Sequence, residues 1–435
     1  MQVITLEAGE LPKPEDIARE SVSDPVVEAS VKEILAAVKE KGDAALLELT
    51  EKFDGQKLKT TEVGEMALQA ASRQVSRPLQ AALQRAGEHI KDFAELQVEH
   101  STWQTRPDGA LVATKVSPLE SVGIYAPGGK ALYPSTVLMC AIPAAVAGVR
   151  RIVLCTPPGP KGAPDPSLLY AAQLAGVTEI HSVGGAQAIA AMAYGTDGIA
   201  KVDKIVGPGN AYVACAKRLL QGVVGSDMIA GPSEVCILAD ETAEPSLVAI
   251  DLLAQAEHDQ NAVCYLVTTD PELADDVQAE LAEYLQDSPR AEISKASLDE
   301  HGKIFIAPDL YTAIQVSNQI APEHLEVQMD SPMELLGLIE NAGAIFLGGW
   351  TPVATGDYLA GPSHTLPTGG SAAYSNPLSV QDFIKKSSVV SYSPAALRAD
   401  GGAIQTIAEH EGLWAHAKSV KARFELFEDS ADEED

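Results

Sequence analysis

A glutamine and a histidine near the end of an expected helix could supply half of a divalent-metal site. The helix is predicted over residues 250–260, and Gln255 and His258 are three positions apart in it, so they would share one face. An amide oxygen and an imidazole nitrogen are both ligands that zinc accepts. Two ligands do not make a site, and a polar helix end in water is the simpler explanation of this pair taken alone.

An adjacent carboxylate and imidazole, Glu323 and His324, stand just before a predicted strand at residues 325–328. Such a pair can act as general acid and base, because the imidazole exchanges protons near neutral pH. A simple surface pair would look the same in the sequence, and that alternative stays open at this point.

Two further pairs of carboxylate and histidine lie later in the chain. Asp357 and His364 belong to residues 351–373, a stretch rich in Gly, Pro, Ser and Thr that predicts a loop of unusual length. Loops of this length in compact domains are more often functional than not. Glu411 and His416 form the second pair. Each pair is a weak signal by itself.

Glycine-rich turns follow three predicted strands in the first half of the chain. They come directly after Tyr125, at Gly184 and Gly185 shortly before Gln187, and at residues 207–210, which end in Asn210. Glycine allows a backbone to approach a phosphate, and helix N-termini attract anions. No GxGxxG motif is present, so a bound dinucleotide would be held unconventionally. Tight strand-to-helix turns explain the glycines equally well.

The elements that must position these residues alternate between strands and helices. The predicted strands cover residues 122–125, 151–155, 178–183, 203–206, 235–238, 263–267, 303–306, 325–328 and 344–347. The predicted helices include residues 26–51, 78–96, 250–260, 271–285, 310–320, 333–341 and 404–427. This alternation predicts parallel sheets with crossover helices, and ligands of such sheets bind at the carboxyl ends of the strands.

The composition narrows the classes of partner. The chain has 435 residues, 46% of them hydrophobic, and a formal charge of −30 from 61 acidic and 31 basic residues. This charge argues against nucleic acid and anionic membranes as partners. Neither a signal peptide nor a membrane span is recognised. Five cysteines without a CxxC motif suit a reducing cytoplasm. The acidic residues 428–435 are expected to be disordered.

Several motifs together resemble the histidinol dehydrogenase family over nearly the whole chain. They are Ala230-Gly231-Pro232-Ser233-Glu234, Gln255-Ala256-Glu257-His258-Asp259, Ala321-Pro322-Glu323-His324-Leu325, Gly356-Asp357-Tyr358 with Gly361-Pro362-Ser363-His364-Thr365-Leu366-Pro367, and Glu411-Gly412-Leu413 with Ala415-His416. The resemblance implies a zinc- and NAD-dependent, four-electron oxidation of L-histidinol to L-histidine through L-histidinal, the final step of histidine biosynthesis. It also implies a homodimer with shared active sites.

The resemblance also implies a role for each candidate residue. Zinc would be bound by Gln255, His258, Asp357 and His416. Glu323 and His324 would be the catalytic acid/base pair. Substrate contacts would come from Ser233, His364 and Glu411, together with His324 and the four zinc ligands. Cofactor contacts would come from Tyr125, Gln187 and Asn210.

The expected architecture is α/β, with two parallel-sheet, Rossmann-like domains. Residues 26–120 and 234–376 would form the first domain, which carries the metal and acid/base residues, and residues 121–233 the second, which binds NAD. A helical segment at residues 1–25 would precede them. A tail at residues 377–427 would cross to the partner subunit and complete its site.

Two alternatives accompany this interpretation. A relative that oxidises another small polyol, such as a sulfonated dihydroxypropane, would lack the histidinol-reading residues, whereas Ser233, His364 and Glu411 are all present. A metal-binding module without catalysis would need neither Glu323 with His324 nor the three cofactor contacts. An assay of NADH production with histidinol separates these possibilities.

Overall fold

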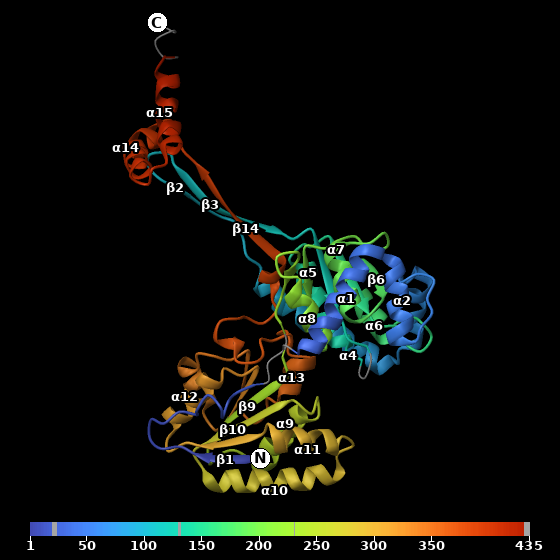
Figure 1. Ribbon diagram of the computed structural model, residues 1–435. Coiled ribbons are helices and arrows are strands. Elements are labelled where there is room, and N and C mark those ends of the chain that lie inside the picture. Colours follow the sequence, from blue (N-terminus) through green and yellow to red (C-terminus); the bar gives the residue numbers. More distant parts are fainter. Residues whose placement is uncertain (20–23, 129–131, 230, 430–435) are drawn as a thin grey trace. The chain divides into compact units, whose positions relative to one another are not determined.

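The computed structural model describes residues 1–19, 24–128, 132–229 and 231–429, and it divides into two compact units (Figure 1). The larger unit comprises Met1–Val98 and Pro118–Phe383, and the smaller one Glu99–Ser117 and Ile384–Asp435. Two parallel sheets lie in the larger unit, which confirms the predicted α/β class. Among the described helices, none combines the length and the apolarity that crossing a membrane requires.

A six-stranded sheet occupies one part of the larger unit, with the order β1-β11-β10-β9-β12-β13 and parallel pairing throughout. Its strands are β1 (Gln2–Thr5), β9 (Glu234–Ala239), β10 (Val263–Thr268), β11 (Lys303–Ile306), β12 (His324–Gln328) and β13 (Ala344–Leu347). The central strands are apolar on both faces, as strands covered by helices on two sides must be.

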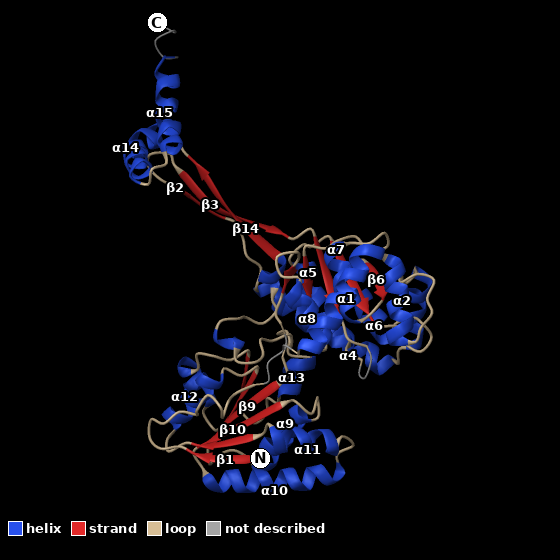
Figure 2. Cartoon of the chain, viewed as in Figure 1, coloured by secondary structure: helices blue, strands red, loops and turns tan. Residues whose placement is uncertain are grey.

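Helices cover both faces of this sheet (Figure 2). Helices α9 (Pro245–Ala256), α10 (Pro271–Asp287) and α11 (Ala291–Glu300) pack on the face that includes Val235 and Ile237. Helix α12 (Leu310–Ile320) and the 3-10 helix η1 (Pro332–Leu338) pack on the face that includes Cys236 and Leu238. Neighbouring residues of β9 therefore face opposite layers, as the pleat requires.

A five-stranded sheet occupies the other part of the larger unit, with the order β6-β5-β4-β7-β8 and parallel pairing. Its strands are β4 (Ser121–Tyr125), β5 (Arg151–Thr156), β6 (Glu179–Ser182), β7 (Lys204–Val206) and β8 (Gly225–Ser226). The crossover helices are α5 (Pro134–Val146), α6 (Pro166–Leu174), α7 (Gly185–Tyr194) and α8 (Ala211–Leu219). The glycine-rich turns lie at the carboxyl ends of these strands, as predicted.

The N-terminal helices pack mainly on the five-stranded sheet, whereas the sequence suggested that they belong to one domain with residues 234–376. Helices α1 (Pro25–Lys41) and α2 (Asp43–Asp54) share an apolar core with α7 and α8. Helices α3 (Glu65–Gln74) and α4 (Arg77–Leu96) share a core with α5 and α6 on the opposite face. Amphipathic spacing predicts that a helix buries one face, but it does not say which sheet receives that face.

The smaller unit consists of a narrow sheet and two helices. The sheet has the order β14-β3-β2, with β2 (Thr102–Thr105), β3 (Leu111–Pro118) and β14 (Ile384–Ser391). Helices α14 (Pro394–His410) and α15 (Trp414–Asp429) pack against each other through Ala408, Ala417 and Val420, among others. The predicted tail therefore shares its unit with residues 99–117, which were expected in the first domain.

Several predicted elements need correction, and glycine explains two of them. The helix expected over 26–51 is broken at Gly42, where φ is +55°, and the one expected over 404–427 is broken at Gly412, where φ is +75°. In place of the α-helix expected over 333–341 there is the 3-10 helix η1, which ends at Leu338, and the loop 351–373 contains the short helix α13 (Val353–Tyr358).

The two ends of the chain also differ from expectation. Within residues 1–25 the described part holds the strand β1 and only the first residue of α1, so this segment is not helical. Strand β1 is short and half polar, so the residues alone do not mark it as a strand. It lies at the edge of the six-stranded sheet, where it pairs with β11. At the other end Glu428 and Asp429 belong to α15, and residues 430–435 lie outside the described part.

Candidate active site

The catalytic candidates Glu323 and His324 are buried at the amino end of β12. Parallel pairing places His324 beside Val235 of β9, which brings Glu323 and Glu234 together. The backbone N–H of Glu234 donates to Glu323 Oε2 at 2.9 Å, and Glu323 Oε2 lies 3.6 Å from His324 Nδ1. The pair is thus a buried feature of the sheet rather than a surface pair.

The hydrogen bonds of His324 fix which of its nitrogens can act as a base. Nδ1 lies 3.0 Å from the backbone carbonyl oxygen of Glu234, which can only accept, so Nδ1 carries the proton. Nε2 is then the nitrogen with a lone pair. Among the described residues, this buried Nε2 has no hydrogen-bond partner, and it lies 3.8 Å from Asp357 Oδ1.

Burial favours the neutral forms of both catalytic candidates. It raises the pKa of Glu323 well above the usual 4.5, and the nearby charges of Glu234 and Asp357 act in the same direction. Burial also lowers the pKa of His324, while the carboxylate of Asp357 opposes that shift. A neutral imidazole at neutral pH can accept a proton at Nε2, which is what a general base must do.

His258 and His364 also lie near His324, in addition to Asp357. The charges of these three residues act on the pKa of His324. The ring of His364 donates from Nδ1 to the backbone carbonyl oxygen of Asp357 at 3.0 Å, and its Nε2 lies 2.9 Å from Thr136 Oγ1. Segments more than 200 residues apart therefore orient one imidazole. Thr136 was not recognised from the sequence.

Gln255 and His258 do not share a helix face, because α9 ends at Ala256. Gln255 is buried in the last turn, and His258 follows in the loop. The His258 ring bends back, and Nδ1 donates to the carbonyl oxygen of Ala254 at 2.9 Å. Such an anchor leaves Nε2 as the nitrogen that can bind a metal and fixes the direction in which it points.

The donor set suits zinc in its chemistry. Gln255 supplies an amide oxygen, His258 an imidazole nitrogen and Asp357 a carboxylate, while His416 belongs to the smaller unit. Over the part of the chain that the structure describes, no three His, Cys, Asp or Glu side chains are grouped as a metal site would need. Of the four candidate ligands, only His258 and Asp357 are residues of these types in the larger unit, since Gln255 is an amide and His416 belongs to the smaller unit.

Ser233, Glu411 and His416 complete the predicted substrate contacts. Ser233 directly precedes β9, next to the Glu234 backbone that binds the catalytic pair. Glu411 follows the last residue of α14, and His416 lies exposed in the first turn of α15, both in the smaller unit. Of the metal, acid/base and substrate candidates, the larger unit places His258, Asp357 and His364 near His324, while Ser233 precedes β9 and Gln255 lies in the last turn of α9.

The cofactor candidates lie at the carboxyl ends of the five-stranded sheet. Tyr125 ends β4 and is buried, and its hydroxyl accepts the backbone N–H of Gly185 at 3.1 Å. Burial raises the pKa of Tyr125 to about 12, so its hydroxyl remains protonated. Gln187 is buried in the first turn of α7. Asn210 caps α8, because its Oδ1 accepts from Tyr212 and Val213, which leaves its amide nitrogen for a ligand.

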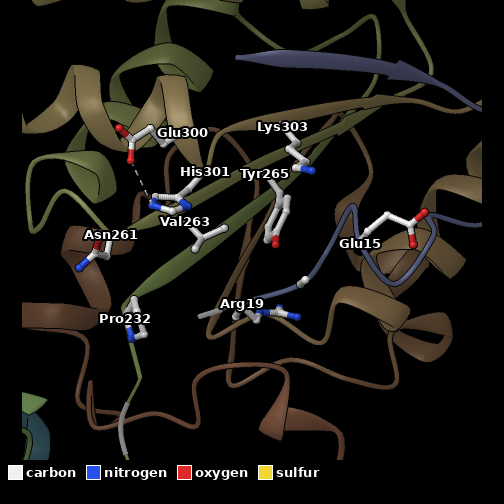
Figure 3. A pocket seen from close by; sticks show the side chains of 10 residues that line it. Glu15, Arg19, Pro232, Asn261, Val263, Tyr265, Glu300, His301 and Lys303 are labelled. Carbon is white, nitrogen blue, oxygen red and sulfur yellow. Dashed lines mark ion pairs between the residues drawn. The ribbon is translucent and has the colours of Figure 1, made fainter. Parts of the chain in front are cut away.

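Arg19 contacts the end of β9 that binds the catalytic pair, and no pattern in the sequence pointed to it. Figure 3 shows it in a pocket with Tyr265, Lys303 and His301, which none of the predicted site residues lines. Its guanidinium donates to Glu234 Oε2 at 2.6 Å and to the carbonyl oxygen of Ile320 at 2.6 Å. Glu234 is fully buried, so this ion pair secures the strand end that binds Glu323 and His324.

A buried carboxyl pair connects the elements that carry the metal and acid/base candidates. Glu326 of β12 and Asp251 of α9 hydrogen-bond to each other, and Gln328 Nε2 donates to both, at 2.7 and 2.9 Å. Glu326 Oε1 also accepts the backbone N–H of Val353, the first residue of α13, at 2.8 Å. Burial and the charge of Asp251 raise the pKa of Glu326 to about 8, so the pair retains a proton near neutral pH.

Glu326→Gln should make the free energy of unfolding depend less on pH. The folded chain holds the Glu326 proton up to about pH 8, whereas the unfolded chain releases it near 4.5. The folded state therefore binds more protons in this window, and stability falls as pH rises through it. Without this titration, the free energy of unfolding should fall less steeply with pH, by up to about 1.4 kcal/mol per pH unit.

Urea unfolding between about pH 5 and pH 8 measures that slope. Glu283→Gln on the exposed side of α10 is the matched control and should retain the wild-type slope. A wild-type slope in Glu326→Gln would contradict the prediction.

The fold and the site together define a class of protein. Two parallel α/β sheets, a buried acid/base pair beside metal-type ligands, and glycine-rich turns at strand ends are features of an α/β oxidoreductase. The family model for histidinol dehydrogenase matches residues 17–424. The chain belongs to the histidinol dehydrogenase family.

Individual relatives agree with this family assignment. A histidinol dehydrogenase of Bacillus cereus is 49% identical over 405 residues, which cover 93% of this chain and 94% of that protein. One from Listeria monocytogenes is 48% identical over 425 residues, covering 98% and 99%. The crystal structure of histidinol dehydrogenase from Elizabethkingia anophelis matches with a TM-score of 0.93 at 36% identity, covering 98% of this chain and 99% of that one. The alternative activity on another small polyol is not supported.

Proposed function

We propose that the chain oxidises L-histidinol to L-histidine through L-histidinal with zinc and NAD, and that the candidate residues act as the family resemblance implies. Gln255, His258, Asp357 and His416 would hold zinc. Tyr125, Gln187 and Asn210 would contact NAD, and Ser233, His364 and Glu411 the substrate. When bound, zinc would anchor and orient the substrate's nitrogens, and NAD would accept a hydride in each oxidation.

The observation that carries this proposal is the buried Nε2 of His324. A buried nitrogen acceptor without a hydrogen-bond partner is costly, and such groups in native proteins call for a functional explanation. Among the described residues this atom has no partner, while Nδ1 is fixed by the Glu234 carbonyl oxygen. A substrate hydroxyl would satisfy Nε2, and its proton would pass to that nitrogen as the alcohol is oxidised.

Glu323 has a separate task in the second oxidation. The aldehyde must first add water, because its hydrate can lose a second hydride and become a carboxylic acid. The Glu323 carboxyl group, which accepts the Glu234 N–H at 2.9 Å, is positioned to order this water, and once it has released its own proton it can accept one from the water. Glu411 would provide a negative charge for the cationic substrate.

The test is the yield of NADH from histidinol. Purified protein with zinc should form two NADH for each histidinol, with histidine as the product, because each oxidation step transfers one hydride. Formation of a single NADH and accumulation of aldehyde would contradict the four-electron reaction. No NADH at all would contradict the proposed activity.

Removal of zinc should abolish the activity, and added zinc should restore it. His258→Ala should reduce the zinc content measured by atomic absorption without lowering the Tm of the metal-free protein, because His258 lies in a loop after α9. His301→Ala, a histidine outside the proposed donor set, is the control and should retain zinc. Full turnover by rigorously metal-free protein would contradict the metal's role.

We also propose that the protein works as a homodimer whose smaller unit completes the partner's site. This unit exposes large apolar side chains in the single chain, including Trp103, Val390, Ile407 and Trp414, with exposed fractions from 60% to 74%. Apolar surface on so small a unit is typical of a protein interface.

We further propose that the protein is located in the cytoplasm. All five cysteines are free and buried, as is typical of proteins in a reducing compartment.

A further inference from the structure

The turn after β7 depends on Gly207 for its shape. Gly207 has φ of +108°, and a Cβ atom there would overlap the backbone carbonyl oxygen of Tyr125. The turn therefore lies directly against the end of β4, where Tyr125 stands, and it leads into Asn210. A displacement of this backbone would move two of the three proposed cofactor contacts relative to each other.

A buried ion pair holds both polar groups of the Gly207 backbone. Asp227 Oδ2 accepts the N–H of Gly207 at 2.7 Å, and Lys217 Nζ donates to its carbonyl oxygen at 2.6 Å. Lys217 Nζ also donates to Asp227 Oδ1 at 2.6 Å, so the three residues form a closed set of hydrogen bonds. Lys217 is in α8, and Asp227 directly follows β8.

The burial of this pair points to positioning rather than to stability. The side chains of Lys217 and Asp227 are only 4% and 1% exposed. The free-energy cost of removing two charges from water offsets most of the attraction between them. Apolar residues of similar volume therefore often stabilise a fold at least as well. Apolar residues could not bind the Gly207 N–H and carbonyl, however. What the ion pair adds is a fixed position for the turn.

We propose that Lys217 and Asp227 are positioning residues for cofactor binding, which hold the turn from Gly207 to Asn210 in the shape that receives NAD. This inference rests on the proposed cofactor site. It assigns to the pair an effect on NAD affinity that is separate from any effect on folding.

The test separates position from stability with two variants of the full-length, zinc-loaded protein. Lys217→Met leaves Asp227 buried without its partner, so both the Tm and the affinity for NADH should fall. Lys217→Met/Asp227→Asn removes both charges, and the Tm should recover most of that loss because no unpaired charge remains. The Gly207 carbonyl oxygen is still unheld, so the Kd for NADH and the KM for NAD should stay raised by about tenfold or more.

A matched control pair lies in the same sheet, at the opposite ends of the strands. Arg151 begins β5 and Glu179 begins β6, and they bind each other at 2.7 and 2.9 Å. Arg151→Met/Glu179→Gln should lower the Tm without changing the Kd for NADH. The KM for histidinol should stay at the wild-type value in this control and in both Lys217 variants.

The readouts are fluorescence titration with NADH, the two KM values and thermal unfolding. A raised NADH Kd in the Lys217→Met/Asp227→Asn protein, with an unchanged Kd in the control, supports the inference. A wild-type NADH Kd in that protein, or an equal rise in the control, overturns it. If the wild-type protein itself binds no NADH, the proposed cofactor site is wrong and this inference falls with it.

Discussion

His324→Ala should slow the oxidation of both histidinol and histidinal by a factor of about 100 or more. The alcohol step needs a base for the hydroxyl proton, and the aldehyde step needs a base during hydration and loss of the second hydride. The buried Nε2 of His324 is the atom available for both tasks, because Nδ1 is occupied by the carbonyl oxygen of Glu234. NADH formation in single turnover, started separately from the alcohol and from the aldehyde, measures each step.

Glu323→Gln tests the division of labour within the catalytic pair. Glutamine has nearly the same shape, and its side-chain oxygen can still accept the Glu234 N–H that binds Glu323 at 2.9 Å. It cannot accept a proton from water, so the aldehyde step should slow more than the alcohol step. Equal slowing from both starting compounds would mean that the carboxyl group acts with His324 as one unit.

His89→Ala is a control for the loss of an imidazole elsewhere in the larger unit. His89 donates from Nδ1 to the carbonyl oxygen of Leu359 at 2.8 Å and belongs to none of the proposed roles. Its removal should leave both oxidation steps near the wild-type rate. A similar loss in this variant would indicate that the effect of His324→Ala comes from the fold.

The sequence predicted those parts of the fold that depend on local pattern. The strands β4 to β7 and β9 to β13 are short apolar runs between turns, and each lies within a few residues of its predicted position, whereas the two-residue β8 was not predicted. The packing of α1 to α4 was predicted wrongly, because an apolar face does not specify its partner. The breaks at Gly42 and Gly412 depend on positive φ values, which a helical pattern of apolar residues does not reveal.

The site shows a similar boundary between what the sequence can and cannot predict. Glu323 and His324 were recognisable because they are adjacent in the chain. Arg19 was not, since its partner Glu234 is 215 residues away and gave no sign of needing a cation. Lys217 and Asp227 were missed because both bind backbone groups of Gly207. Every residue carries such groups, so the sequence does not show which ones need a side-chain partner.

His258 illustrates a prediction whose geometry was wrong although the residue remains a candidate. Helical spacing would place it on the same face as Gln255, but α9 ends before it. The ring is oriented instead by the carbonyl oxygen of Ala254 at 2.9 Å. Two metal ligands thus need not lie in the same helix, because a hydrogen bond from the ring to the backbone can orient an imidazole equally well.

Mixing two inactive variants should restore activity if the smaller unit serves the partner's site. His258 lies in the larger unit and His416 in the smaller one, so each variant disables a different unit. His258→Ala and His416→Ala proteins should each be nearly inactive as homodimers. In a heterodimer, one site would combine the intact larger unit of one chain with the intact smaller unit of the other. The second site would carry both defects.

The size of the recovery follows from the symmetry of a dimer. Equal amounts of the two chains, exchanged at random, give about half heterodimers, each with one intact site of two, so activity should reach about a quarter of wild type. Differently tagged chains allow the heterodimer to be purified and the exchange to be verified. If each smaller unit completed its own chain's site, no site in the mixture would be intact, and the verified heterodimer would remain inactive.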